Sequence, residues 1–220
     1  MKNDLTKRIL SSITLLPLSL FFIIKGSVFF IYFLSILFLF SCLEWLNLNK
    51  KKNFFKFLGI IFLLFSFYFT YLIREEYGLY FFLLILTICI FTDIGGYIFG
   101  KMLKGPKLTK LSPNKTYAGV IGSFLSSLLS GLIFIKYIQI NYLDEISFKI
   151  FFFILLISLI SQIGDLTISY FKRKADLKDT GKILPGHGGF LDRIDGVIFV
   201  MPITYLCVLP ILINKLDLIK

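Results

Sequence analysis

The chain has 220 residues, of which 57% are hydrophobic and 27 are Phe, and its formal net charge at pH 7 is +11. A soluble domain of this length could not bury so much apolar surface, so the composition excludes an ordinary soluble enzyme, a disordered chain and a nucleic-acid-binding domain. We expect the surplus of Lys and Arg to lie beside a membrane surface, and we expect no nucleic acid as a partner.

The sequence contains apolar stretches that lack Asp, Glu, Lys and Arg and approach the roughly 20 residues needed to cross a bilayer. In chain order they are Ile9–Ile24, Gly26–Leu43, Phe57–Ile73, Tyr77–Thr92, Thr116–Ile135, Ile150–Gly164 and Gly196–Asn214. They predict an all-α polytopic integral membrane protein with about seven transmembrane helices. Eight or nine helices stay open as alternatives, because Asp93–Gly100 and Ile160–Phe171 could form separate, more polar helices.

The basic residues are unevenly divided between the loops that seven helices would define. Most of the 24 Lys and Arg residues fall on the side of the N-terminus, chiefly within residues 50–56, 101–115 and 172–193. Cytoplasmic loops of membrane proteins carry an excess of Lys and Arg. We therefore expect the N-terminus and these loops to face the cytoplasm.

The polar residues that could carry chemistry gather in two segments, residues 93–119 and 161–196. In the second segment, Asp165 follows directly on an apolar run. Helical spacing places it on one face with three other polar residues, Gln162, Ser169 and Lys172. A carboxylate at the edge of a membrane core is costly and typical of a functional site. The structural alternative is an ion pair of Asp165 with Lys172 or Arg173.

A glycine-rich stretch, Leu184–Gly189, follows in the same segment. Three glycines, Gly186, Gly188 and Gly189, surround His187, which is the only His of the chain. Such a loop can present backbone N–H groups to phosphate oxygens, although a tight turn without function would have the same composition.

Asp192 and Asp195 then open the last apolar helix, on one helical face. The N-terminus of a helix tolerates anions, and an N-cap is the structural alternative for Asp192. Carboxylates without a His or thiolate partner suit a hard cation such as Mg²⁺. We therefore expect Asp165, Asp192 and Asp195 to hold Mg²⁺, and a second cation stays open.

In the first polar segment, Asp93 ends an apolar run, and Ser112, Lys115 and Thr116 lead into a helix. Hydroxyls and an ammonium at a helix N-terminus can hold phosphate, although an N-cap beside a topology-determining Lys would look the same. Carboxylates, Mg²⁺ and many cations together are typical of phosphoryl or nucleotidyl transfer. The sequence has no Walker A motif, so this is not a P-loop site.

The stretch from Ser169 to Asp195 resembles the signature of the phosphatidate cytidylyltransferases, also called CDP-diacylglycerol synthases. The matching residues are Ser169, Lys172, Arg173, Lys178, Asp179, Gly181, Leu184, Pro185, His187, Gly188, Gly189, Asp192, Arg193 and Asp195. Upstream, the residues that resemble the family are Asp93, Gly95, Tyr97, Gly100, Lys101, Leu111, Ser112, Pro113, Lys115, Thr116 and Gly119.

The resemblance implies an enzyme of the inner (plasma) membrane that makes CDP-diacylglycerol and pyrophosphate from CTP and phosphatidic acid, for phospholipid biosynthesis. The expected catalytic residues are Asp165, Lys172, Arg173, Lys178, Asp179, His187, Asp192, Arg193 and Asp195. The residues expected to bind the nucleotide are Asp93, Ser112, Lys115, Thr116, Gly186, Gly188 and Gly189. We expect one membrane domain, residues 1–220, with helical spans in 1–92 and the catalytic part in 93–220. A homodimer stays open.

Two other functions and two roles of His187 stay open from the sequence. A CTP-dependent polyprenol kinase would transfer the γ-phosphoryl group and release CDP. A transporter of a phosphorylated metabolite would have matched inverted halves, of which the sequence gives no sign. We expect His187 to order the glycine loop by a hydrogen bond, with general acid catalysis as the alternative.

Overall fold

The computed structural model describes residues 2–48, 53–109, 112, 115–138, 148–181, 183 and 188–208. Within these ranges the chain forms helices and no β-strand, which confirms the predicted all-α class. It divides into two compact units, and each is described by itself. Unit 1 comprises Met1–Leu79 and Tyr170–Asp195, and unit 2 comprises Tyr80–Ser169 and Gly196–Lys220. The predicted division into residues 1–92 and 93–220 concerns function and stays a prediction.

Five of the described helices are long and apolar enough to cross a membrane. They are α2 (Ser27–Leu48), α3 (Asn53–Glu76), α4 (Gly78–Leu103), α5 (Tyr117–Ile138) and α6 (Phe148–Lys174). Two shorter apolar segments, Ile13–Lys25 and Val197–Cys207, lie in α1 (Lys2–Lys25) and in α8 (Val197–Ile203) with the π-helical turn η1 (Thr204–Val208). These segments correspond to the predicted apolar runs, so the protein is embedded in a membrane.

The two polar stretches that left eight or nine helices open do not form helices of their own. Asp93–Gly100 continues α4, and Ile160–Phe171 continues α6, without a break in the helical backbone. Helical hydrogen bonds run through a polar or glycine residue when neighbouring helices supply the packing. The alternative that these two stretches add helices to the predicted seven is therefore wrong.

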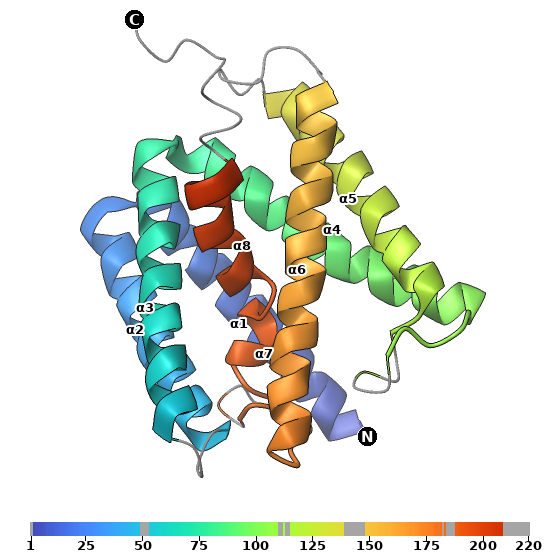
Figure 1. The fold of residues 1–220 in the computed structure, drawn as a ribbon. Helices are drawn as coiled ribbons and strands as arrows, with labels where there is room; N and C mark the ends of the chain where they lie inside the picture. Colours follow the sequence, from blue (N-terminus) through green and yellow to red (C-terminus); the bar gives the residue numbers. More distant parts are fainter. Residues whose placement is uncertain are drawn as a thin grey trace, which may run out of the picture. The chain divides into compact units, whose positions relative to one another are not determined.

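In unit 1, α1, α2 and α3 follow one another as antiparallel neighbours (Figure 1). The chain turns between α1 and α2 at Gly26, whose φ of 65° lies in the left-handed region. Arg74 at the end of α3 donates its Nε to the carbonyl of Ile23 at 3.1 Å, which satisfies a carbonyl at the end of α1. Glu75 accepts the backbone N–H of Ser27 at 3.2 Å, so α3 stabilises this turn through two side chains.

In unit 2, α4 and α5 pack closely because small residues line their contact. A Cβ atom at Gly95 of α4 would collide with the Ser126 side chain and approach the Gly122 carbonyl on α5. Without side chains between them, the two backbones come close enough for dispersion and polar contacts, which drive helix association in lipid. One such contact is the Ser123 hydroxyl, which donates to the Thr92 carbonyl at 2.7 Å.

Helix α6 contributes to both units, because its residues up to Ser169 belong to unit 2 and those from Tyr170 belong to unit 1. On the unit 1 side, the Phe171 ring packs edge-on against Trp45 of α2, with ring centroids 4.8 Å apart. After α6 the chain passes through residues 175–190 into the short helix α7 (Leu191–Ile194).

Candidate active site

A pocket in unit 2, here called the α4–α6 pocket, has a volume of about 270 Å³. Its lining comes from α4, α5, α6 and the loop before α5, and comprises Thr92, Asp93, Gly96, Tyr97, Ser112, Lys115, Thr116, Gly119, Val120, Ser123, Gln162 and Asp165. The structure therefore brings together Asp93, Ser112, Lys115 and Thr116, four of the residues expected to bind the nucleotide, with Asp165. Charged groups inside a membrane bundle are costly, so their concentration in one cavity marks it as a candidate site.

The loop before α5 is shaped by its own backbone hydrogen bonds. The Leu108 N–H donates to the Lys115 carbonyl at 2.8 Å, and the Lys115 N–H donates to the Ser112 carbonyl at 3.0 Å. Thr116 then accepts the Gly119 N–H through its side-chain oxygen at 3.1 Å, which makes it the N-cap of α5. Thr116 therefore has the N-cap role that the sequence left open as a structural alternative, and it also lines the α4–α6 pocket.

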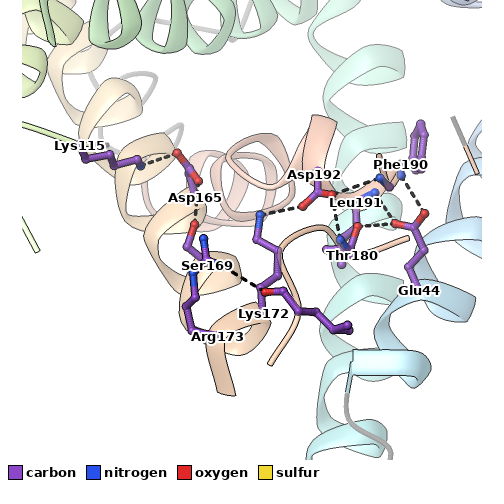
Figure 2. Close-up of polar contacts among 12 residues, drawn as sticks. Glu44, Lys115, Asp165, Ser169, Lys172, Arg173, Thr180, Phe190, Leu191 and Asp192 are labelled. Atoms are coloured by element: carbon purple, nitrogen blue, oxygen red, sulfur yellow. Dashed lines mark hydrogen bonds and ion pairs between the residues drawn. The ribbon is translucent and has the colours of Figure 1, made fainter. Parts of the chain in front are cut away.

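Lys115 and Asp165 form an ion pair in this pocket (Figure 2). Both side chains keep about a quarter of their surface exposed, at 27% and 26%. The Ser169 hydroxyl, one helical turn further along α6, donates to the other oxygen of Asp165 at 3.3 Å. Lys172, named as a structural partner of Asp165 from the sequence, instead pairs with Asp192.

A chain of hydroxyl groups connects the walls of the α4–α6 pocket. The Thr92 hydroxyl donates to Ser158 at 2.9 Å, and the Gln162 side-chain amide reaches the same oxygen at 3.5 Å. Thr92 and Ser158 are both buried. Buried polar groups that are hydrogen-bonded to one another fix the relative rotation of the helices that carry them. This network therefore sets the directions in which Asp93 and Asp165, one and three residues away, leave α4 and α6.

In unit 1, Asp192 is the centre of a second polar cluster. Its Oδ1 accepts a 2.7 Å bond from the Lys172 ammonium, and its Oδ2 accepts the backbone N–H of Thr180 at 2.9 Å and of Gly189 at 3.2 Å. These contacts are visible in Figure 2. The N–H of Gly189, which the sequence offered for phosphate binding, thus binds a carboxylate of the protein itself.

Glu44 of α2 is a member of this cluster that the sequence analysis missed. It is 2% exposed, and its carboxylate accepts hydrogen bonds from the Thr180 hydroxyl and the backbone N–H groups of Phe190 and Leu191. Glu44 ends a charge-free run just as Asp165 does, so the same intramembrane-carboxylate signal was present in the sequence. We refer to Glu44, Lys172, Thr180 and residues 189–192 as the Glu44–Asp192 cluster.

The remaining predicted residues differ in their surroundings. Arg173, Lys178, Asp179 and Arg193 are exposed, whereas Asp195 is buried. Arg173 donates to the Leu177 carbonyl at 3.3 Å, beyond the end of α6. Gly188 has a φ of 83°, in the left-handed region that favours glycine. Gly186 and His187 lie outside the described residues, so both predicted roles of His187 stay predictions.

The carboxylate oxygens of the described residues decide where Mg²⁺ could bind. Within the part of the chain that the structure describes, no three His, Cys, Asp or Glu side chains gather in a group that could hold a metal ion. Mg²⁺, however, is commonly held by one or two carboxylates together with substrate phosphates. Asp93 and Asp165 in the α4–α6 pocket have the oxygen chemistry for this. Both oxygens of Asp165 already have a donor, Lys115 and Ser169, and both oxygens of Asp192 do as well, so a cation at either carboxylate would replace one of these donors.

Comparisons with known proteins identify the family. The sequence pattern of the cytidylyltransferase family matches residues 54–210. A protein of Rickettsia bellii named phosphatidate cytidylyltransferase is 36% identical over 215 residues, which cover 93% of this chain and 90% of the relative. One from Staphylococcus aureus with the same name is 42% identical over 161 residues, 70% of this chain. One from Staphylococcus saprophyticus is 37% identical over 170 residues, 73% of this chain.

The matched region is only 60% of the length of the Staphylococcus aureus relative and 64% of that from Staphylococcus saprophyticus. The family pattern nevertheless covers both the α4–α6 pocket and the Asp192 end of the Glu44–Asp192 cluster. It also covers both motif segments in which the sequence resembled this family. The chain therefore belongs to the cytidylyltransferase family, and its relatives there are phosphatidate cytidylyltransferases.

Proposed function

We propose that this protein transfers the cytidylyl group of CTP to phosphatidic acid, giving CDP-diacylglycerol and pyrophosphate. The observation that supports this most directly is the α4–α6 pocket, where an ammonium, hydroxyls and two carboxylates line one cavity of a membrane-embedded member of this family. A lipid substrate explains why such a polar cavity belongs in a membrane.

The reaction needs charge neutralisation more than a strong base. The phosphate monoester of phosphatidic acid is already an anion near neutral pH, and one of its oxygens forms a bond to the α-phosphorus of CTP. The bond from that phosphorus to the β-phosphate oxygen breaks, and its electron pair leaves with pyrophosphate. Preorganised cations stabilise such developing charge. Lys115 lines the α4–α6 pocket and would do this, with Ser112 and Thr116 as further phosphate contacts.

Magnesium would supply further charge neutralisation on the triphosphate. Asp165 and Asp93 offer oxygen ligands that fit this ion in the α4–α6 pocket. Asp192 and Asp195 stay proposed ligands from the sequence, and ligation by Asp192 would exchange an N–H or ammonium donor for the cation. The protein's own residues would orient the two anions, and Lys172 and Arg173 stay phosphate contacts predicted from the sequence.

We further propose that the site faces the cytoplasm and that the membrane is the plasma membrane. The bacterial relatives and the concentration of Lys and Arg in three loops support this. Positive charge on that side would also attract CTP and anionic lipid. The homodimer left open by the sequence stays a prediction.

The proposal is tested by incubating the purified full chain in mixed micelles with Mg²⁺, cytidine-labelled CTP and phosphatidic acid. We expect labelled lipid to form with an equal amount of pyrophosphate, and only when phosphatidic acid is present. Diacylglycerol, which lacks the phosphate, is the matched control substrate and should give no labelled lipid. Absence of labelled lipid from an intact, folded preparation would contradict the proposal.

A further inference from the structure

We propose that Glu44 is a positioning residue, whose carboxylate holds Thr180–Gly181 and Gly188–Leu191, described parts of the segment before Asp192, in the conformation that presents Asp192. The proposal concerns the same reaction and so rests on the proposed function. Its structural part, the fixing of this segment by Glu44, stands on contacts within unit 1 alone.

The burial of Glu44 requires an explanation. It lies in α2, a helix with a mean hydropathy of 2.1 over its most apolar window, and its side chain is 2% exposed. A carboxylate buried in such surroundings is tolerated only when it is fully hydrogen-bonded. The donors come from residues 136 to 147 positions later in the chain: the Thr180 hydroxyl at 2.7 Å and the N–H groups of Phe190 and Leu191 at 2.8 Å each.

Thr180 connects Glu44 to Asp192. Its hydroxyl donates to Oε2 of Glu44, while its backbone N–H donates to Oδ2 of Asp192 at 2.9 Å. The Glu44 bonds to Phe190 and Leu191 hold the chain immediately before Asp192. Both ends of the segment are thereby tied to one buried carboxylate, and Asp192 is left with its other oxygen on Lys172.

The glycines of this segment are adapted to the Glu44 carboxylate. A Cβ atom at Gly181 would collide with Oε1 of Glu44, and one at Gly189 would collide with the Thr180 hydroxyl and approach Oε2 of Glu44. These positions lack side chains because the backbone closes around a carboxylate. Gly181 and Gly189 therefore have a structural reason in Glu44 that differs from direct phosphate binding.

The test uses the full chain in detergent with four variants. Glu44→Gln keeps the shape of the side chain but replaces one carboxylate oxygen by an NH₂ group. That group would face the Thr180 hydroxyl and the backbone N–H groups, which are themselves hydrogen-bond donors. Thr180→Val removes the hydroxyl without changing the size, and Thr180→Ser restores it. Glu75→Gln is the matched control, because Glu75 also accepts one backbone N–H from α2, in an exposed position at the end of α3.

Hydrogen exchange measures the structural part and kinetics measure the positioning part. In Glu44→Gln we expect the amides of Thr180 and of residues 189–191 to exchange about tenfold faster, since hydrogen bonds to a charged group are lost, while peptides of α3 stay unchanged. We expect kcat to fall about tenfold or more with less than about a twofold change in the KM for CTP, as expected when transition-state contacts alone are lost. Thr180→Val should likewise raise the exchange rate and lower kcat. Thr180→Ser and Glu75→Gln should match the wild type in both quantities.

Wild-type exchange at Thr180 and residues 189–191 in Glu44→Gln would overturn the proposal, and so would faster exchange with unchanged kcat. If Glu44→Gln does not fold, the two Thr180 variants provide the test. Wild-type exchange and wild-type kcat in Thr180→Val would then overturn the proposal. A wild-type chain that makes no CDP-diacylglycerol contradicts the proposed function instead, and hydrogen exchange then still decides whether Glu44 holds the segment.

Discussion

Lys115 combines two contacts that define its chemistry: its ammonium pairs with Asp165, and it lines the α4–α6 pocket. Because the pair is partly exposed, the ammonium can exchange the carboxylate for a phosphate oxygen at modest cost. The backbone hydrogen bonds with Leu108 and Ser112 hold Lys115 at the start of α5.

Replacing Lys115 should therefore weaken nucleotide binding selectively. In Lys115→Ala we expect the KM for CTP to rise about tenfold, the usual cost of one charge-assisted phosphate contact, with a smaller change for phosphatidic acid. Steady-state kinetics with each substrate varied in turn measure this. Lys136→Ala removes an exposed ammonium near the other end of α5 and should leave both KM values unchanged. A change confined to the lipid KM would reassign the loop to lipid binding.

Asp192 is the residue on which the Glu44–Asp192 cluster converges. Asp192→Asn keeps the volume but removes the charge opposite Lys172 and places an amide donor among N–H groups. We expect turnover to fall about a hundredfold or more, in the range found when a charged catalytic contact is lost. Asp176→Asn, in the exposed turn after α6, is the control and should retain full activity. Near-normal turnover of a folded Asp192→Asn protein would remove Asp192 from the proposed machinery.

At the scale of the element, the contact between α4 and α5 positions the walls of the pocket. Gly95→Ala would force the two helices apart, because the added Cβ collides with the Ser126 side chain and the Gly122 carbonyl. We expect overpacking to destabilise the protein by about 1–3 kcal/mol, measured as a lowered Tm in detergent. In Gly105→Ala the Cβ would meet only Ala118 at 3.5 Å, an ordinary contact, so its Tm should stay close to that of the wild type. Equal Tm values for the two variants would contradict this description of the contact.

Hydropathy and local motifs predict the elements better than their connections. The apolar runs anticipated the membrane helices, and the motif residues Ser112, Lys115 and Thr116 do line one pocket with Asp165. The continuity of α4 through Asp93 was not predictable by charge counting, because a carboxylate and several glycines resemble a helix end. It depends on α5, whose small residues and Ser123 hydroxyl pack against that stretch.

Glu44 shows why part of the candidate site could not be predicted. Its donors, Thr180, Phe190 and Leu191, lie more than 130 positions away along the chain, and no local pattern connects them. The sequence suggested phosphate as the partner of the glycine-rich amides. In the fold, the Glu44 and Asp192 carboxylates accept the N–H groups of residues 189–191.

At the scale of the whole molecule, the distribution of Lys and Arg predicts which side of the membrane the loops face. We expect a Cys introduced at Asp176, in a variant without the three native Cys residues, to lie on the cytoplasmic side. A membrane-impermeant maleimide should then label intact cells only after permeabilisation. A Cys introduced at Gly78, the first residue of α4, is the matched control and should be labelled in intact cells. The reverse pattern would contradict the proposed orientation.

In the proposed reaction the α-phosphoryl group of CTP, with its cytidine, is transferred to phosphatidic acid. The most direct measurement follows two labels separately, using CTP labelled at the α-phosphate in one reaction and at the γ-phosphate in another. We expect the α-label to enter the lipid and the γ-label to leave entirely as pyrophosphate, in equal amounts. A γ-label recovered in the lipid with release of CDP would identify a CTP-dependent kinase and would contradict the proposed reaction.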